Sequence, residues 1–96
     1  MKKLIVNADD FGRHLSINAA VSRAFTEGFL RSATVMPGGS AFDDAIAIVR
    51  KYPGLGLGVH LTLVGEVPVL PADQIPSLVN DRGRLHDDYG AFMKKY

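Results

Sequence analysis

The order of apolar patterns along the chain is the feature that most restricts its fold. Three short apolar runs, at residues 3–6, 32–36 and 55–63, are typical of buried strands. Between them lie two segments, residues 17–27 and 40–51, whose apolar side chains recur at helical spacing. A β-α-β-α-β order with short connections predicts a parallel sheet with right-handed crossovers. We therefore predict an α/β fold.

Residues at the ends of the two helical segments fit this prediction. Ser16 is placed to cap the first helix, and Gly28 is placed to end it in a left-handed conformation. Ser40 is placed to cap the second helix. Asp43 and Asp44 then fall in its first turn, where the helix dipole favours negative charge.

The pattern changes after residue 63. We predict one domain over residues 1–96, with a βαβαβ core at residues 1–63 and a proline-bearing loop and short helix at residues 64–96. The helix is expected over residues 86–96, and the acidic residues after His86 are interpreted as its first turn rather than as a metal site.

The composition excludes several classes of protein. A hydrophobic fraction of 47% and a charged fraction of 22% are those of a soluble globular domain. A net charge of +1 gives no reason to expect nucleic acid or an anionic membrane as a partner. The chain has no cysteine, which excludes disulfides and thiolate metal sites and is compatible with the cytoplasmic location that we predict. No uncharged run is long enough to span a bilayer.

Two adjacent carboxylates, Asp9 and Asp10, follow the first apolar run. Like charges at this distance repel each other and are costly to bury unless they are compensated. Neighbouring side chains at a strand end point in different directions, so one carboxylate can bind a metal ion while the other acts as a base. The alternatives are helix capping and solvent exposure.

Other candidate residues lie at the same predicted rim, because the carboxyl ends of parallel strands share one edge of a sheet. His60 lies near the end of the third strand. It is either a metal ligand or a histidine packed in the core. Phe11, Gly12 and His14 follow the acidic pair and are predicted to contact substrate, with solvent exposure as the alternative for His14. Residues 37–39 are predicted to form a plain turn.

Three segments together carry a family resemblance. The sequences Asn-Ala-Asp-Asp-Phe-Gly at 7–12, Ser-Ala-Thr-Val-Met at 32–36 and Gly-Val-His-Leu-Thr-Leu at 58–63 resemble the YdjC-like carbohydrate deacetylases, which include chitooligosaccharide deacetylases. Residues 68–79, followed by Gly83, are similar to the hopanoid-biosynthesis-associated branch, HpnK.

The resemblance implies a (β/α) barrel related to polysaccharide deacetylases and metal-dependent removal of an N-acetyl group from an amino sugar. It implies Asp9 as general base, and Asp10 and His60 as ligands of a divalent ion, magnesium or zinc. For the HpnK branch the implied substrate is an N-acetylglucosaminyl hopanoid; a chitooligosaccharide-like substrate is the other possibility.

The chain is short for this family. The family site needs a further histidine ligand and a general acid from later strands, and such a barrel takes about 250 residues. We therefore expect a fragment or a truncated gene product that is inactive alone, or that self-associates into homo-oligomers through exposed sheet edges.

Two alternatives come from other classes. A phosphoacceptor receiver module also carries an acidic pair after its first strand, but it needs an Asp at the end of the third strand, where this chain offers His60. A non-catalytic assembly fragment is the second alternative.

Overall fold

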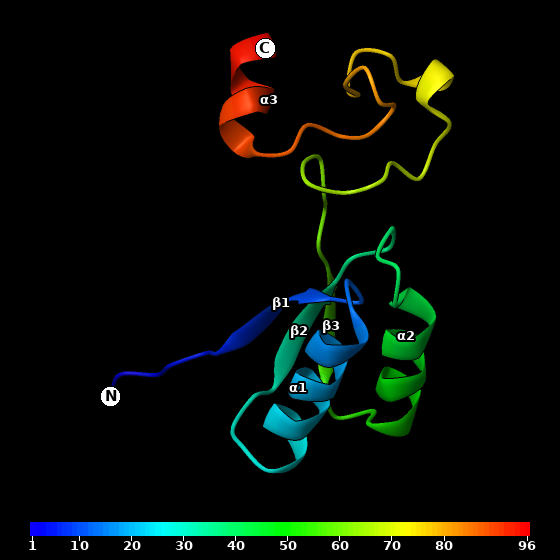
Figure 1. Ribbon diagram of the computed structural model, residues 1–96. Coiled ribbons are helices and arrows are strands. Elements are labelled where there is room, and N and C mark those ends of the chain that lie inside the picture. Colours follow the sequence, from blue (N-terminus) through cyan, green and yellow to red (C-terminus); the bar gives the residue numbers. More distant parts are fainter. The chain divides into compact units, whose positions relative to one another are not determined.

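The computed structural model describes residues 1–96 as two compact units, Met1–Leu61 and Thr62–Tyr96 (Figure 1). The first unit contains three strands and two helices: β1 (Asn7–Phe11), α1 (Leu15–Thr26), β2 (Ser32–Val35), α2 (Phe42–Lys51) and β3 (Gly56–Val59). The strands form a parallel sheet in the order β1-β2-β3. The predicted α/β fold with a parallel sheet is confirmed.

The sheet register is regular on one side of β2 and interrupted on the other. The pairing of β2 with β3 runs without a break to Val35 and Val59. The pairing of β1 with β2 slips between Ala8 and Phe11. The two aspartates therefore lie in an irregularity of the strand, where side chains are re-aimed.

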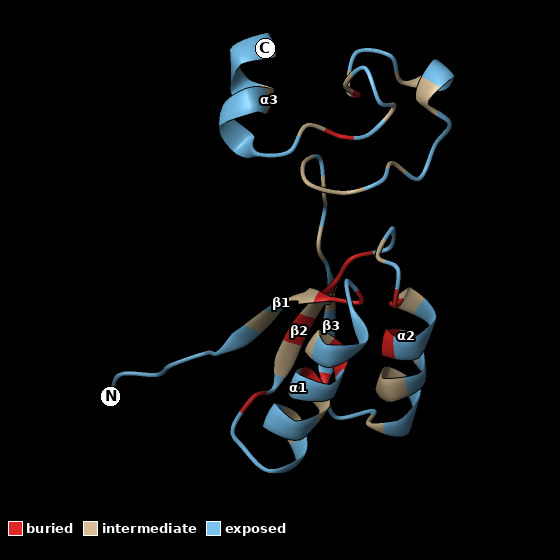
Figure 2. Cartoon of the chain, viewed as in Figure 1, coloured by how far each residue is buried: buried red, intermediate tan, exposed pale blue.

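The core lies between the sheet and the two helices, which cover the same side of the sheet (Figure 1). Figure 2 shows the buried positions gathered on the strands and on the helix surfaces that face them. Burial of apolar area of this kind is the main source of stability in a small unit. The core side chains are Phe11, Val21, Leu30, Ala33, Val35, Ala45 and Leu55.

Two predicted strands have different limits in the structure. The strand expected at residues 3–6 was wrong, since β1 covers the five residues that follow. Its partner β2 begins only at Ser32, so the earlier apolar residues have no strand to pair with. The strand expected over 55–63 is shorter, because β2 ends at Val35, opposite Val59.

Both predicted helix caps were wrong. His14 is the N-cap of α1, with Nδ1 accepting a hydrogen bond from the Ser16 backbone N–H at 3.2 Å. Ala41 is the N-cap of α2 and makes no side-chain capping bond. The Ser40 hydroxyl instead donates to the Arg13 carbonyl oxygen at 2.8 Å, so it ties together the loops that follow β1 and β2.

Charge placement at the start of α2 was predicted correctly, but the role of Gly28 was not. Asp43 and Asp44 occupy the first turn of α2. Gly28 is not among the glycines with positive φ, so it does not end α1 in a left-handed conformation. A Cβ at this position would lie 2.7 Å from the Ala24 carbonyl oxygen. Glycine is required because the backbone at residue 28 passes so close to the end of α1.

The second unit contains a 3₁₀ turn, η1 (Ala72–Gln74), and a helix, α3 (Tyr89–Lys95). The helix begins later than predicted, because Asp88 is its N-cap and accepts from the Ala91 N–H at 2.7 Å. His86 precedes the helix and forms a bridge with Val64. Neither unit has a helix of the length and apolar character that a membrane span requires.

Candidate functional site

Asp9 is anchored through one of its two carboxylate oxygens. Oδ1 accepts hydrogen bonds from Asn7 Nδ2 at 3.0 Å and from Thr34 Oγ1 at 3.1 Å. The structure shows no hydrogen bond to Oδ2, and the residue is exposed. The side chain is thus held in one orientation with its second oxygen open to solvent.

Asp10 is the one residue other than glycine with a positive φ, 58°. Aspartate tolerates this conformation better than most residues, but strained backbone persists only where the surroundings impose it. The resulting turn aims the Asp10 N–H at His60 Nδ1, 3.3 Å away. It also places Asp10 Oδ1 3.8 Å from His60 Nε2 and Oδ2 3.6 Å from the Arg13 guanidinium.

His60 follows directly after β3 and is held by the sheet. Its backbone N–H donates to the Val35 carbonyl oxygen at 2.8 Å, which continues the pairing with β2 by one residue. The side chain is 28% exposed. The predicted convergence of the strand ends is therefore observed, although the roles of Asp9, Asp10 and His60 remain predictions.

The pair formed by Asp10 and His60 fits a divalent cation. A carboxylate oxygen and an imidazole nitrogen suit zinc and similar ions. Because each metal–ligand bond is about 2.0–2.2 Å long, two ligands of one ion lie up to about 4 Å apart, and the observed 3.8 Å is within that span. No group of three or more His, Cys, Asp or Glu side chains that could hold a metal ion is present. Asp10 and His60 could therefore supply at most two ligands of a site from this chain.

Comparison with known proteins identifies the family. The sequence model of the YdjC-like proteins matches residues 3–96. The chain belongs to the YdjC-like family. A carbohydrate deacetylase of Brevibacillus brevis is 42% identical over 83 residues, which are 86% of this chain and 33% of that protein. A chitooligosaccharide deacetylase of Serratia marcescens is 43% identical over 84 residues, 88% of this chain and 32% of that protein.

A solved structure has a similar fold. The crystal structure of an Enterococcus faecalis V583 protein, provisionally described as a cellobiose-phosphate cleavage protein, superposes with a TM-score of 0.89 at 37% identity. The superposition covers 98% of this chain and 37% of that one. This YdjC-like chain thus spans about a third of the length of its relatives. The receiver-module alternative finds no support among them.

The predicted substrate contacts have structural roles in this YdjC-like chain. Phe11 is 0% exposed and packs in the core, so its side chain is not accessible to a ligand in this conformation. The Gly12 N–H donates to Asn18 Oδ1 at 2.7 Å, and its carbonyl oxygen accepts from the Ala41 N–H at 2.9 Å. His14 caps α1. Substrate contact by these residues stays a prediction without geometric support.

Sequence reasoning missed Asn18, which braces the loop after the acidic pair. This fully buried amide donates to the Ala41 carbonyl oxygen at 2.9 Å and to Asp44 Oδ2 at 2.8 Å, besides accepting from Gly12. An asparagine beside Ile17, on the apolar side of the predicted helix, was the available signal.

Sequence reasoning also missed Asn7 and Thr34, the two donors to Asp9. Alternation along β1 puts Asn7 and Asp9 on the same face, which was a readable signal. The role of Thr34 depends on which residue of β1 lies beside it. Sequence does not give that register.

The loop after β2 packs against the loop after β1. A Cβ on Gly39 would overlap the Gly12 carbonyl oxygen, so only glycine fits there. Residues 37–39 therefore form a turn that also brings the backbone of this loop into contact with the loop after β1.

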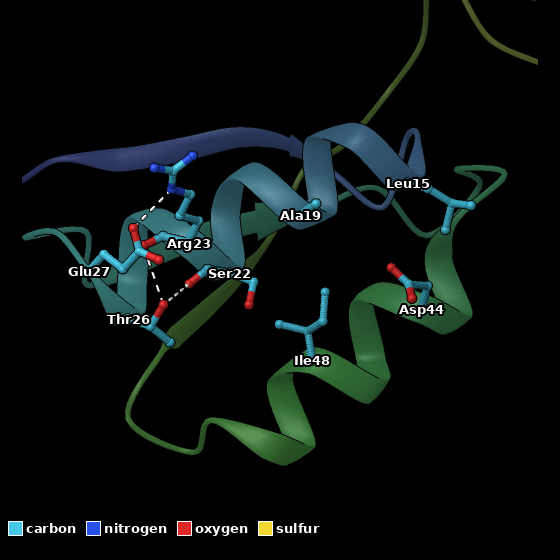
Figure 3. Close-up of a pocket in the computed structure, with 8 residues that line it drawn as sticks. All are labelled: Leu15, Ala19, Ser22, Arg23, Thr26, Glu27, Asp44 and Ile48. Carbon is cyan, nitrogen blue, oxygen red and sulfur yellow. Dashed lines mark hydrogen bonds and ion pairs between the residues drawn. The ribbon is translucent and has the colours of Figure 1, made fainter.

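A surface groove of about 460 Å³ lies between α1 and α2 (Figure 3). Its polar wall includes the Arg23–Glu27 ion pair, whose N···O distance is 2.9 Å. None of the predicted site residues lines the groove, so it is separate from the acidic rim. Its lining residues are Leu15, Ala19, Ser22, Arg23, Thr26, Glu27, Asp44 and Ile48.

Proposed function

We propose that the protein that carries this chain is a metal-dependent hydrolase that removes the N-acetyl group from an amino sugar. The observation that carries the proposal is that the two adjacent carboxylates at the strand ends make different contacts. Asp9 keeps one carboxylate oxygen open, while Asp10 pairs with His60 at a distance suited to one cation. The carbohydrate deacetylases among the relatives support the substrate class.

In this proposal Asp9 is the general base. Its Oδ1 is saturated by Asn7 and Thr34, so Oδ2 is the oxygen that takes a proton from the attacking water. Asp10 and His60 would hold the divalent ion, magnesium or zinc, which when bound polarises the amide carbonyl and stabilises the oxyanion.

The remaining parts of the site are proposed to lie outside these 96 residues. Two protein ligands are fewer than the three usual at a catalytic zinc site, and the relatives are more than twice as long as this chain. We propose that this chain forms the first βαβαβ part of a (β/α) barrel and is inactive alone. The outer edges of β1 and β3 have no strand partner, which supports self-association of the isolated chain.

The substrate within this class is a finer proposal. The similarity of residues 68–79 to the HpnK branch implies an N-acetylglucosaminyl hopanoid, and a chitooligosaccharide-like substrate is the alternative. The proposed location is the cytoplasm, with which the absence of cysteine is compatible. Acetate release from each substrate, measured side by side, separates the two.

The test of the function is acetate release by the full translated product of the gene, with Mg²⁺ or Zn²⁺ added. Asp9→Asn should lower kcat at least about 100-fold, in the range of a lost general base. Asp43→Asn, an exposed carboxylate on α2, is the matched control and should retain wild-type activity. No acetate release with any divalent metal, or full activity of Asp9→Asn, would contradict the proposal.

A further inference from the structure

We propose that Thr34 selects the imidazole tautomer in which His60 binds a divalent cation. The inference rests on the proposed metal site and adds a positioning residue to it. It starts from a conflict between two neighbours of the same ring nitrogen. His60 Nδ1 lies 3.3 Å from the Asp10 backbone nitrogen and 3.5 Å from Thr34 Oγ1.

The two neighbours require opposite states of Nδ1. The Asp10 backbone N–H can only donate, so it needs a lone pair on Nδ1. Thr34 has one hydroxyl hydrogen, and its nearest acceptor is Asp9 Oδ1 at 3.1 Å, ahead of the Ala8 carbonyl oxygen at 3.5 Å. Toward His60 the Thr34 oxygen can therefore only accept, which needs a hydrogen on Nδ1.

The choice at Nδ1 decides what Nε2 can do. A neutral imidazole carries one N–H, so acceptance from Asp10 leaves the hydrogen on Nε2, which then faces Asp10 Oδ1 at 3.8 Å. That tautomer has no Nε2 lone pair for a cation. When Nδ1–H donates to Thr34 instead, Nε2 carries the lone pair and lies 3.8 Å from the same Asp10 carboxylate oxygen.

Thr34 then has the role that a carboxylate or carbonyl has behind most metal-binding histidines. It links the ring to Asp9, since Nδ1–H of His60 donates to Oγ1 and the hydroxyl donates to Asp9 Oδ1. Without a cation, His60 Nδ1 accepts a hydrogen bond from the Asp10 backbone N–H. With a cation, Nδ1 carries a hydrogen and donates it to Thr34 Oγ1 instead. Asn7 still anchors Asp9 when the hydroxyl is removed, because its Nδ2 is 3.0 Å from Oδ1.

Thr34→Val keeps the shape of the side chain and removes the hydroxyl. We expect it to weaken Zn²⁺ binding by about 10–100-fold, the usual effect of losing such a partner. Thr34→Ser restores the hydroxyl and should bind within about threefold of wild type. Thr26→Val, on the exposed end of α1, is the matched control and should bind as wild type does.

Two measurements on the full translated product of the gene test the proposal. Calorimetric titration with Zn²⁺, and separately with Mg²⁺, gives the affinities of the wild type and the variants. Nitrogen-15 NMR of the imidazole, at a pH where the ring is neutral, reports which nitrogen carries the hydrogen. We expect Nε2–H in the metal-free chain and Nδ1–H after Zn²⁺ is added.

The outcomes separate this inference from the proposed function. If Asp10→Ala and His60→Ala lose Zn²⁺ binding while Thr34→Val keeps it, the role of Thr34 is overturned and the metal site stands. If neither Asp10→Ala nor His60→Ala changes binding, both are overturned. The NMR measurement needs no variant, so Nε2–H that persists on His60 after Zn²⁺ is bound overturns the proposal even where Thr34→Val does not fold.

Discussion

The Asp10 backbone N–H and Nδ1 of His60 lie 3.3 Å apart, although 50 positions separate the two residues in the sequence. The contact joins the ends of β1 and β3, the two outer strands of the sheet. Thr34 on the central strand lies within 3.5 Å of the same ring nitrogen. The candidate site therefore depends on all three strands at once.

The left-handed backbone at Asp10 should make its substitutions unequal. Asp10→Asn and Asp10→Val both remove the charge and the weak contact with Arg13. Only valine, which is β-branched, conflicts with a φ of 58°. We expect Asp10→Val to lower the free energy of unfolding by about 1–3 kcal/mol, and Asp10→Asn by less than about 0.5 kcal/mol. Urea unfolding followed by circular dichroism measures both, and equal stabilities would contradict the argument.

Asn18 should be essential for stability. Asn18→Ala leaves the Gly12 N–H buried without a partner. It also removes one of two hydrogen bonds to the Ala41 carbonyl oxygen, which still accepts from the Ala45 N–H. Such a loss costs about 2–3 kcal/mol. Thr26→Ala, which removes an exposed hydroxyl from the same helix, should cost less than about 1 kcal/mol. Thermal and urea unfolding of the two variants give the comparison, and similar values for both would refute the bracing role.

The contact between the two loops predicts a difference between two glycines. In Gly39→Ala the new methyl group would overlap the Gly12 carbonyl oxygen, whereas in Gly54→Ala its nearest neighbour is Phe25 Cζ at 3.5 Å. We expect Gly39→Ala to destabilise by about 3 kcal/mol and Gly54→Ala by less than about 0.5 kcal/mol. Denaturant midpoints at constant m-value provide the test, and a stable Gly39→Ala variant would show that the loops are not closely packed.

Phe11 should behave as a core residue. Phe11→Ala removes a side chain that is 0% exposed, and we expect a loss of about 3–5 kcal/mol. Phe29 is 76% exposed, so Phe29→Ala should cost less than about 0.5 kcal/mol. Calorimetric unfolding of each variant separates the two, and a small effect of Phe11→Ala would contradict the core role and favour the substrate contact first predicted.

The order of elements was predictable because it depends on local periodicity. Apolar side chains at helical spacing identified α1 and α2, and the acidic first turn of α2 needed only its own residues. Strand limits were less predictable. Leu4 and Ile5 have the composition of a buried strand but are 86% and 84% exposed, because no strand of this chain lies beside them.

The sequence by itself determined that Asp9, Asp10 and His60 come near one rim, since the carboxyl ends of parallel strands meet at one edge of a sheet. It did not determine that Thr34 bonds Asp9, or that Asp10 and Thr34 compete for one nitrogen of His60. Those contacts follow from the register of β1 on β2 and from its slip between Ala8 and Phe11. Register is set by pairing between distant segments, so only the tertiary structure could decide it.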